Sequence, residues 1–146
     1  MSSELIWHGP EVIKKMAQAT EAGLTACAMQ VHGQAVLLTP VITSRLKNSL
    51  TYRVGKFKSN ISSPAQPEDE ITTEPTEGEA IIGTNVFYAA GVELGNPPHD
   101  IPNAFGWGIV AHHPGNAPRS YLRKALDTVS KQLDSIFSKE YNRVMK

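Results

Sequence analysis

Three histidines and one aspartate in a single stretch of the chain carry groups that could bind a metal ion or transfer a proton: His99, Asp100, His112 and His113. Imidazole nitrogens and a carboxylate oxygen suit a catalytic zinc site. The chain has neither an HExxH nor a CxxC motif, and adjacent side chains such as His112 and His113 do not easily face one ion. The pattern therefore favours histidines of an exposed, proline-rich loop, and a metal-dependent hydrolase that uses His99, His112 and His113 is an alternative.

Other signatures of catalysis are missing from the sequence. The single cysteine, Cys27, falls on the apolar stripe of an expected helix, which favours a buried structural thiol over a nucleophile. The chain has no GxSxG, GxGxxG or Walker-type motif, and its paired carboxylates lie only within 68–79, where a solvated surface is expected. We therefore expect no enzyme, with no catalytic residue, bound metal or cofactor.

A basic segment and an acidic segment follow one another along the chain. Residues 45–58 contain lysines and arginines but no acid, together with Tyr52 and Phe57, which could stack on bases; a nucleic-acid-binding accessory protein is a second alternative. The formal net charge of zero argues against broad nucleic-acid binding. If the two segments instead pair between copies, a head-to-tail ring is favoured. The charges expected at a subunit contact or at the lumen of a ring are Glu68, Asp69, Glu70, Arg45, Lys47 and Arg53.

The elements that must position these residues belong to one domain of 146 residues. Apolar and small residues at spacings of three and four predict long helices over 10–38 and 118–144. Between them, 49–57 and 79–84 are predicted strands, and 86–92 is either a helical turn or a strand. The predicted fold is α+β, with two long helices packed on one face of a small, mostly antiparallel sheet and with long loops. The acidic segment 59–78 carries no core signal and is predicted as a surface loop, with a short strand possible at 71–73.

Four segments of the chain, taken in order, resemble one protein family. They are IWHGPEVIKKM at the first long helix, TPVITSRLKNSL at its end, FYAAGVELG with Tyr88, Ala89, Glu93 and Gly95, and APRSYLRKAL at the last helix. Together they resemble the tail-completion, or tail-to-head joining, minor tail components of long-tailed bacteriophages. Members of that family often have glycine at the position of Ser44, where glycine permits a positive φ, so the turn is expected to differ in this chain.

The resemblance implies a structural virion protein of the phage neck, which completes the tail and joins it to the head connector by forming a ring of six copies. The implied partners are other copies of the chain, a head-completion or connector protein, and the tail tube or tail terminator protein. DNA would pass through the lumen without specific binding. The implied location is the virion and, during assembly, the host cytoplasm. No apolar stretch approaches the ~18 residues of a membrane span, and no secretory signal is expected at the beginning of the sequence.

The segment 96–117 holds more apolar surface than a loop can leave in water. Its apolar side chains include Phe105, Trp107, Ile109 and Val110. Because aromatic side chains in pockets dominate binding energy, we expect an arm or hairpin that packs on an adjacent subunit or on the tail tube. The alternative is that Phe105 and Trp107 fold back onto the sheet of their own chain.

The two ends of this segment are expected to be fixed by an ion pair. Glu93 precedes the segment and Arg119 follows it, so a charge-assisted bond between them would hold both ends together. Pro118 is expected at the start of the last helix, where its fixed φ suits the first turn. Tyr121 is expected in the core.

Overall fold

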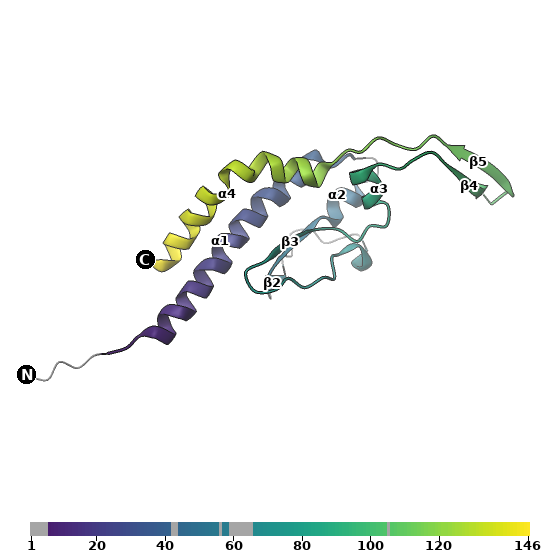
Figure 1. Ribbon diagram of the computed structural model, residues 1–146. Helices are drawn as coiled ribbons and strands as arrows, with labels where there is room; N and C mark the ends of the chain where they lie inside the picture. Colours follow the sequence, from purple (N-terminus) through teal and green to yellow (C-terminus); the bar gives the residue numbers. More distant parts are fainter. Residues whose placement is uncertain (1–5, 42–43, 56, 59–65, 105) are drawn as a thin grey trace, which may run out of the picture.

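The structure of the chain is a computed structural model that describes residues 6–41, 44–55, 57–58, 66–104 and 106–146 (Figure 1). The predicted α+β class is confirmed, since long helices at both ends of the chain enclose short helices and antiparallel strands. The helices are α1 (Gly9–Leu38), α2 (Arg45–Ser49), α3 (Ala89–Leu94), α4 (Tyr121–Met145) and the 3-10 helix η1 (Pro67–Asp69). The strands are β1 (Thr51–Val54), β2 (Phe57–Lys58), β3 (Ala80–Gly83), β4 (His99–Ala104) and β5 (Ile109–His113).

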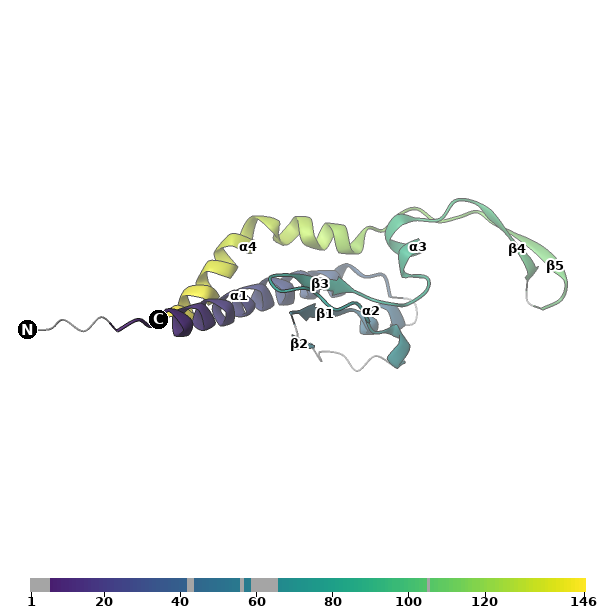
Figure 2. The ribbon, with the colours of Figure 1, turned by 60° about the horizontal axis from the view of Figure 1, so that its bottom comes forward.

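Helices α1 and α4 run side by side in opposite directions, and α1 lies between α4 and the sheet (Figures 1 and 2). Helix α1 has Pro10 in its first turn, and its last turn is closed by the N–H of Thr39, which donates to the carbonyl of Ala35 at 2.9 Å. Pro40 then prevents the helix from continuing. None of the described helices is long and apolar enough to cross a membrane.

The main core lies where α1, α2, α3 and the first half of α4 meet. Tyr121, as predicted, is only 1% exposed, and burial with the nearby Glu93 raises the pKa of its phenol to about 12. Leu126, next to Ala125 on α4, points away from this core and is exposed. The buried cluster contains Val31, Ala35, Leu46, Leu50, Val86, Ala89, Tyr121, Ala125 and Val129.

Further along the helix pair, the contact depends on a glycine. A Cβ atom built at Gly23 would lie 2.6 Å from the ring of Phe137 on α4, so only glycine leaves room for this aromatic side chain. The thiol of Cys27 donates to the carbonyl of Leu133 on α4 at 3.5 Å, and burial raises its pKa. A raised pKa disfavours the thiolate, which agrees with a structural role.

The sheet has β1 at its centre, with β2 and β3 antiparallel on either side. The predicted single strand over 49–57 is wrong, because Gly55 has φ 52 and turns the chain between β1 and β2. Tyr52 and Val54 are buried against α1. The predicted strand over 79–84 corresponds to β3. Of the two forms expected for 86–92, the helical one is found, since residues 89–92 belong to α3.

The turn before α2 and the acidic segment both depart from expectation. Ser44 has φ 61, the left-handed conformation that glycine favours, so the turn keeps a positive φ without glycine. In the acidic segment, residues 71–73 form no strand, and Ile71 and Asp69 are buried. The expectation that this segment contributes nothing to the core is therefore wrong. Residues 59–65 lie outside the described part.

Strands β4 and β5 form a separate antiparallel hairpin that projects away from the helices and the sheet (Figures 1 and 2). Its register is regular from His99, opposite His113, to Ile101, opposite Ala111, and shifts before Ala104, which pairs with Ile109. Residues 96–117 are thus a hairpin arm, one of the two forms that the sequence predicted.

Candidate protein interface

The base of the hairpin is a tight crossing of its two chain segments. The backbone N–H groups of Asn96 and Asn116 each donate to the carbonyl of the other residue at 3.0 Å, and the two side-chain amides are joined at 3.1 Å. Gly95 and Gly115 flank the crossing with φ values of 78 and 80. A Cβ at Gly95 would lie 2.7 Å from the carbonyl oxygen of Asn116, and one at Gly115 would collide with the carbonyl oxygen of Asn96. Glycine is therefore required at both positions for the segments to approach.

The expected ion pair between Glu93 and Arg119 is wrong. The carboxylate of Glu93 instead accepts hydrogen bonds from the backbone N–H groups of Leu122 at 2.9 Å and Arg123 at 3.1 Å. These N–H groups belong to the first turn of α4, where the backbone has no partner within the helix and the helix dipole attracts a negative charge. Glu93 is therefore the N-terminal cap of α4.

Arg119 takes part, through its backbone, in the connection between α3 and the beginning of α4. Its N–H donates to the carbonyl of Val92 at 2.9 Å, and the N–H of Ser120 donates to the carbonyl of Glu93 at 3.1 Å. Pro118 does not lie in the first turn as expected, because Ser120 has φ 50 and α4 begins only at Tyr121. The joint thus couples the end of α3, the beginning of α4 and both segments of the hairpin.

The hairpin presents its histidines on two opposite faces. The rings of His99 and His113 stack with centroids 4.9 Å apart, while His112 lies 2.8 Å from the carboxylate of Asp100. Since side chains alternate between the faces of a strand, His112 points away from the other two histidines. Within the described ranges, no three side chains are placed to hold a metal ion together. The metal-dependent hydrolase therefore receives no support from this geometry.

The apolar side chains of the hairpin lie in solvent rather than on the sheet of their own chain. Trp107 is 78% exposed, Val110 62% and Ile109 54%. The alternative in which Trp107 folds back is therefore wrong, and Phe105 lies outside the described residues. A two-stranded hairpin is marginal by itself in water, and an exposed apolar patch marks an interaction site. This hairpin is the best candidate for an interface.

Two of the charges expected between subunits are paired inside the chain. The guanidinium of Arg45 donates two hydrogen bonds of 2.7 Å to the carboxylate of Asp69, whose side chain is 3% exposed. The hydrogen bonds from Arg45 lower the pKa of Asp69 below its usual value. The basic and acidic segments therefore meet within one molecule, and the carboxylate of Asp69 is buried in that contact.

The remaining charges of these segments differ in their availability. Glu68 is exposed, whereas Glu70 and Lys47 are half-buried. Arg53 donates to the carbonyl of Thr72 at 3.4 Å. Tyr52 is 3% exposed and packs edge-on against His32, so its ring cannot stack on a base. The nucleic-acid alternative thereby loses one of its aromatic groups and, with Arg45, one of its cations.

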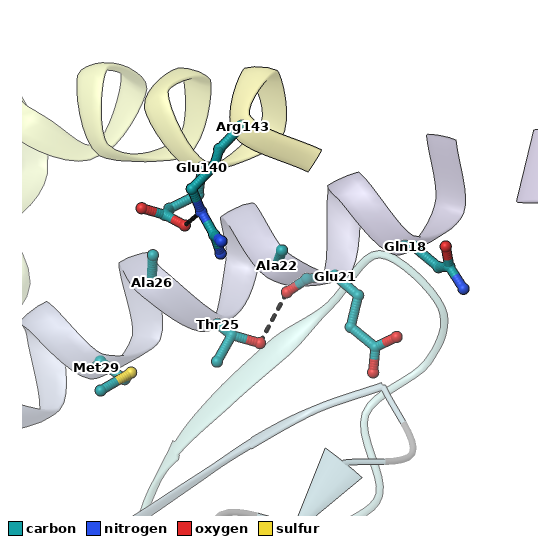
Figure 3. Close-up of a pocket in the computed structure, with 8 residues that line it drawn as sticks. All are labelled: Gln18, Glu21, Ala22, Thr25, Ala26, Met29, Glu140 and Arg143. Atoms are coloured by element: carbon teal, nitrogen blue, oxygen red, sulfur yellow. Dashed lines mark hydrogen bonds and ion pairs between the residues drawn. The ribbon is translucent and has the colours of Figure 1, made fainter. Parts of the chain in front are cut away.

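A second surface feature, which the sequence analysis missed, is an apolar groove between α1 and the end of α4 (Figure 3). Its volume is about 590 Å³. Ala22 and Ala26, small residues four positions apart in a predicted helix, were the sequence signal that could have found it. The residues that line the groove are Gln18, Glu21, Ala22, Thr25, Ala26, Met29, Glu140 and Arg143.

Comparisons of the chain with protein-family models, with curated proteins and with solved structures found no match.

Proposed function

We propose that the chain is a structural protein of the neck of a long-tailed bacteriophage, which completes the tail and joins it to the head connector as a ring. The observation that carries this proposal is the projecting β4–β5 hairpin, whose Trp107, Ile109 and Val110 lie in solvent. The body of the molecule leaves this surface uncovered, and a partner that covers it would gain the hydrophobic free energy of its burial.

The motif residues behind the resemblance support the same proposal. Glu93, from the segment FYAAGVELG, caps the helix that opens within the segment APRSYLRKAL. Tyr88 packs against the main core, which contains Tyr121. Two of the four segments that carry the resemblance therefore meet at the point where the hairpin joins the body.

The ring of this proposal has six copies, as the resemblance implies. Its neighbours are a head-completion or connector protein on one side and the tail tube or tail terminator protein on the other, and DNA passes through the lumen without specific binding. Of the acids expected at the lumen or at a subunit contact, Glu68 is exposed, and in this proposal it faces either the lumen or the outside. An acidic lumen would let DNA slide, since like charges repel.

The proposal is tested by measuring the mass of the purified chain with light scattering and by negative-stain imaging, alone and with isolated tail tubes. We expect closed rings, or rings that form on the tubes. The double variant Ile109→Ser/Val110→Ser should weaken assembly, whereas Leu37→Ser, at a residue 73% exposed on α1, serves as the matched control. A chain that stays monomeric and never joins tubes contradicts the proposal.

Two further measurements address the alternatives with the same sample. Zinc or manganese bound stoichiometrically to the purified protein would favour the hydrolase. DNA binding whose affinity falls steeply with salt would favour the nucleic-acid-binding protein, because counterion release accompanies contacts to phosphates.

A further inference from the structure

Two histidines form the first cross-strand pair of the hairpin beyond its crossing. His99 of β4 lies directly opposite His113 of β5, and their rings stack with centroids 4.9 Å apart and 27° between the ring planes. Residues directly opposite each other in antiparallel strands share one face, so the two rings stand together on one side of the hairpin. The pair lies at the base of the hairpin, where a change of charge acts on both of its strands.

The hydrogen bonds of the two rings fix which nitrogen of each carries the hydrogen. The Nδ1 atom of His99 lies 3.0 Å from the carbonyl oxygen of Pro97, which can only accept, so this nitrogen is the donor. The Nδ1 atom of His113 accepts a hydrogen bond of 3.0 Å from the backbone N–H of Gly115, so this nitrogen presents its lone pair. The ring of His113 is therefore neutral in this hairpin, with its hydrogen on Nε2.

The donor to His113, Gly115, belongs to the crossing that holds the hairpin on the body. Gly115 has φ 80, and a Cβ atom there would collide with the carbonyl oxygen of Asn96. The next residue, Asn116, exchanges two backbone hydrogen bonds of 3.0 Å with Asn96. The ring of His113 thus fixes the backbone directly beside the crossing.

Protonation of His113 is incompatible with this arrangement for two reasons. The added proton must go to Nδ1, where it would point at the N–H of Gly115 and remove the acceptor of that hydrogen bond. In addition, two charged rings stacked like those of His99 and His113 repel each other. Because histidine changes its charge between about pH 5 and 8, both effects fall in mild acid.

The other charged groups near the pair do not offset these effects. The segment 96–117 contains one acid and no lysine or arginine, and that acid, Asp100, lies 2.8 Å from His112 on the opposite face. The next charged residues along the chain are Glu93, whose carboxylate is bound by N–H groups of α4, and the cation Arg119. The hairpin projects away from the helices and the sheet, so their charged side chains do not face the pair (Figures 1 and 2).

The histidine on the opposite face responds to acid with the opposite sign. Protonation of His112 gives it a full charge beside the carboxylate of Asp100, which strengthens that pair. Both side chains are about two-thirds exposed, at 69% and 66%, so the gain is small.

We propose that the His99–His113 pair is a pH-sensitive hinge, which holds the hairpin on its crossing at neutral pH and loosens it in mild acid. The ordered hairpin requires a neutral His113, so the stabilisation is present above the pH range in which histidine titrates and is lost as the pH falls through it. This inference goes beyond the proposed function and does not depend on it, because it concerns the hairpin of a single chain.

Nuclear magnetic resonance of the full chain tests the hinge. Between about pH 7.5 and 5, the amide signal of Gly115 is expected to move upfield in step with the titration of the His113 ring, because its hydrogen bond is lost. After correction for the intrinsic pH dependence of exchange, the amides of Asn96 and Asn116 should exchange roughly 2- to 10-fold faster at the lower pH, the effect of losing one ordinary hydrogen bond. If the wild-type chain forms rings, the Ile109→Ser/Val110→Ser background supplies the monomer.

Two variants of neighbouring histidines separate the hinge from other effects of acid. In His113→Asn the amide oxygen can still accept from Gly115 but does not titrate, so the exchange of the Asn96 and Asn116 amides should no longer accelerate in acid. His112→Asn is the matched control on the opposite face, and it should keep the full acceleration of the wild-type chain. Unchanged signals of α1 and α4 confirm that both variants are folded.

Three results would overturn the inference. One is equal protection of the wild-type Asn96 and Asn116 amides at both pH values. Another is a His113→Asn chain that accelerates in acid as much as the wild-type chain, and the third is a His112→Asn chain that does not accelerate. All of these are measured on the hairpin of a monomer, so the inference can fail while the proposed ring stands, and the reverse.

Discussion

The ion pair between Arg45 and Asp69 attaches the acidic segment to helix α2 across 24 residues of chain. Because the pKa of Asp69 is lowered in the folded state, the carboxylate stabilises the fold at pH values above its ordinary value of 3.8. That contribution is lost as the pH falls through the lowered value, where the folded protein must also bind a proton. The residue therefore links stability to acid pH.

We predict that Asp69→Asn lowers the free energy of unfolding at pH 7, because it leaves the charge of Arg45 without its partner. The same variant should lose less additional stability than the wild-type chain when the pH is lowered from 5 to about 2. Urea unfolding at both pH values measures the two effects. Glu68→Gln, at the exposed neighbouring acid, should change stability little, and equal effects of the two substitutions would contradict the assignment.

Glu93 is a second single residue that contributes to stability, because it caps α4. We predict that Glu93→Ala costs about 1–2 kcal/mol of stability, since two N–H groups of the first turn lose their acceptor. Arg119→Ala should stay within about 0.5 kcal/mol, as expected for an exposed side chain away from such a feature. Chemical denaturation of both variants measures the difference. Equal losses of stability in the two variants would instead favour the ion pair that the sequence suggested.

At the scale of elements, the contact between α1 and α4 depends on which glycine of α1 faces the partner helix. Gly23 lies under the ring of Phe137, whereas nothing lies within 4 Å of a Cβ at Gly33. We predict that Gly23→Ala destabilises the fold by about 1–3 kcal/mol through overpacking. Gly33→Ala should stabilise it by up to about 1 kcal/mol through helix propensity. Thermal unfolding compares the two, and a stabilising Gly23→Ala would show that the helices do not pack closely there.

The elements themselves could be predicted wherever a single helix or strand period controlled the pattern. The long helices followed from apolar spacing and from Pro40, and the arm followed from an excess of apolar residues within 96–117. The break between β1 and β2 was missed because it depends on the backbone conformation of Gly55. The burial of Asp69 was missed because its partner is distant in sequence, and local composition indicated only a solvated loop.

The exposed arm could be predicted from the sequence, but the contacts that hold it on the body could not. An arm with exposed aromatic residues could be inferred from composition. The number of apolar side chains within 96–117 can be counted without knowing where each one points. The partner of Glu93 could not be inferred, since a carboxylate near an arginine suggests an ion pair, while backbone N–H groups carry no signal in the sequence. The groove was missed for a related reason, because it is formed jointly by α1 and the end of α4, whose residues are distant in the sequence.

At the scale of the whole molecule, the hairpin stands outside the body that contains the core (Figure 2). We predict that its backbone amides exchange hydrogen rapidly in the monomer, because a two-stranded hairpin without a packed face opens easily. In the assembled ring the amides of β4 and β5 should become protected, while those of α1 and α4 are protected in both states. Hydrogen exchange measured by mass spectrometry tests this, and unchanged exchange of the hairpin on assembly would contradict it.

The crossing of Asn96 and Asn116 fixes the hairpin to the body at one point. Both of its segments are clamped at one point, directly beside the bonds that Glu93 makes to the beginning of α4. A sideways load on the tip therefore acts as a torque on the first turn of that helix.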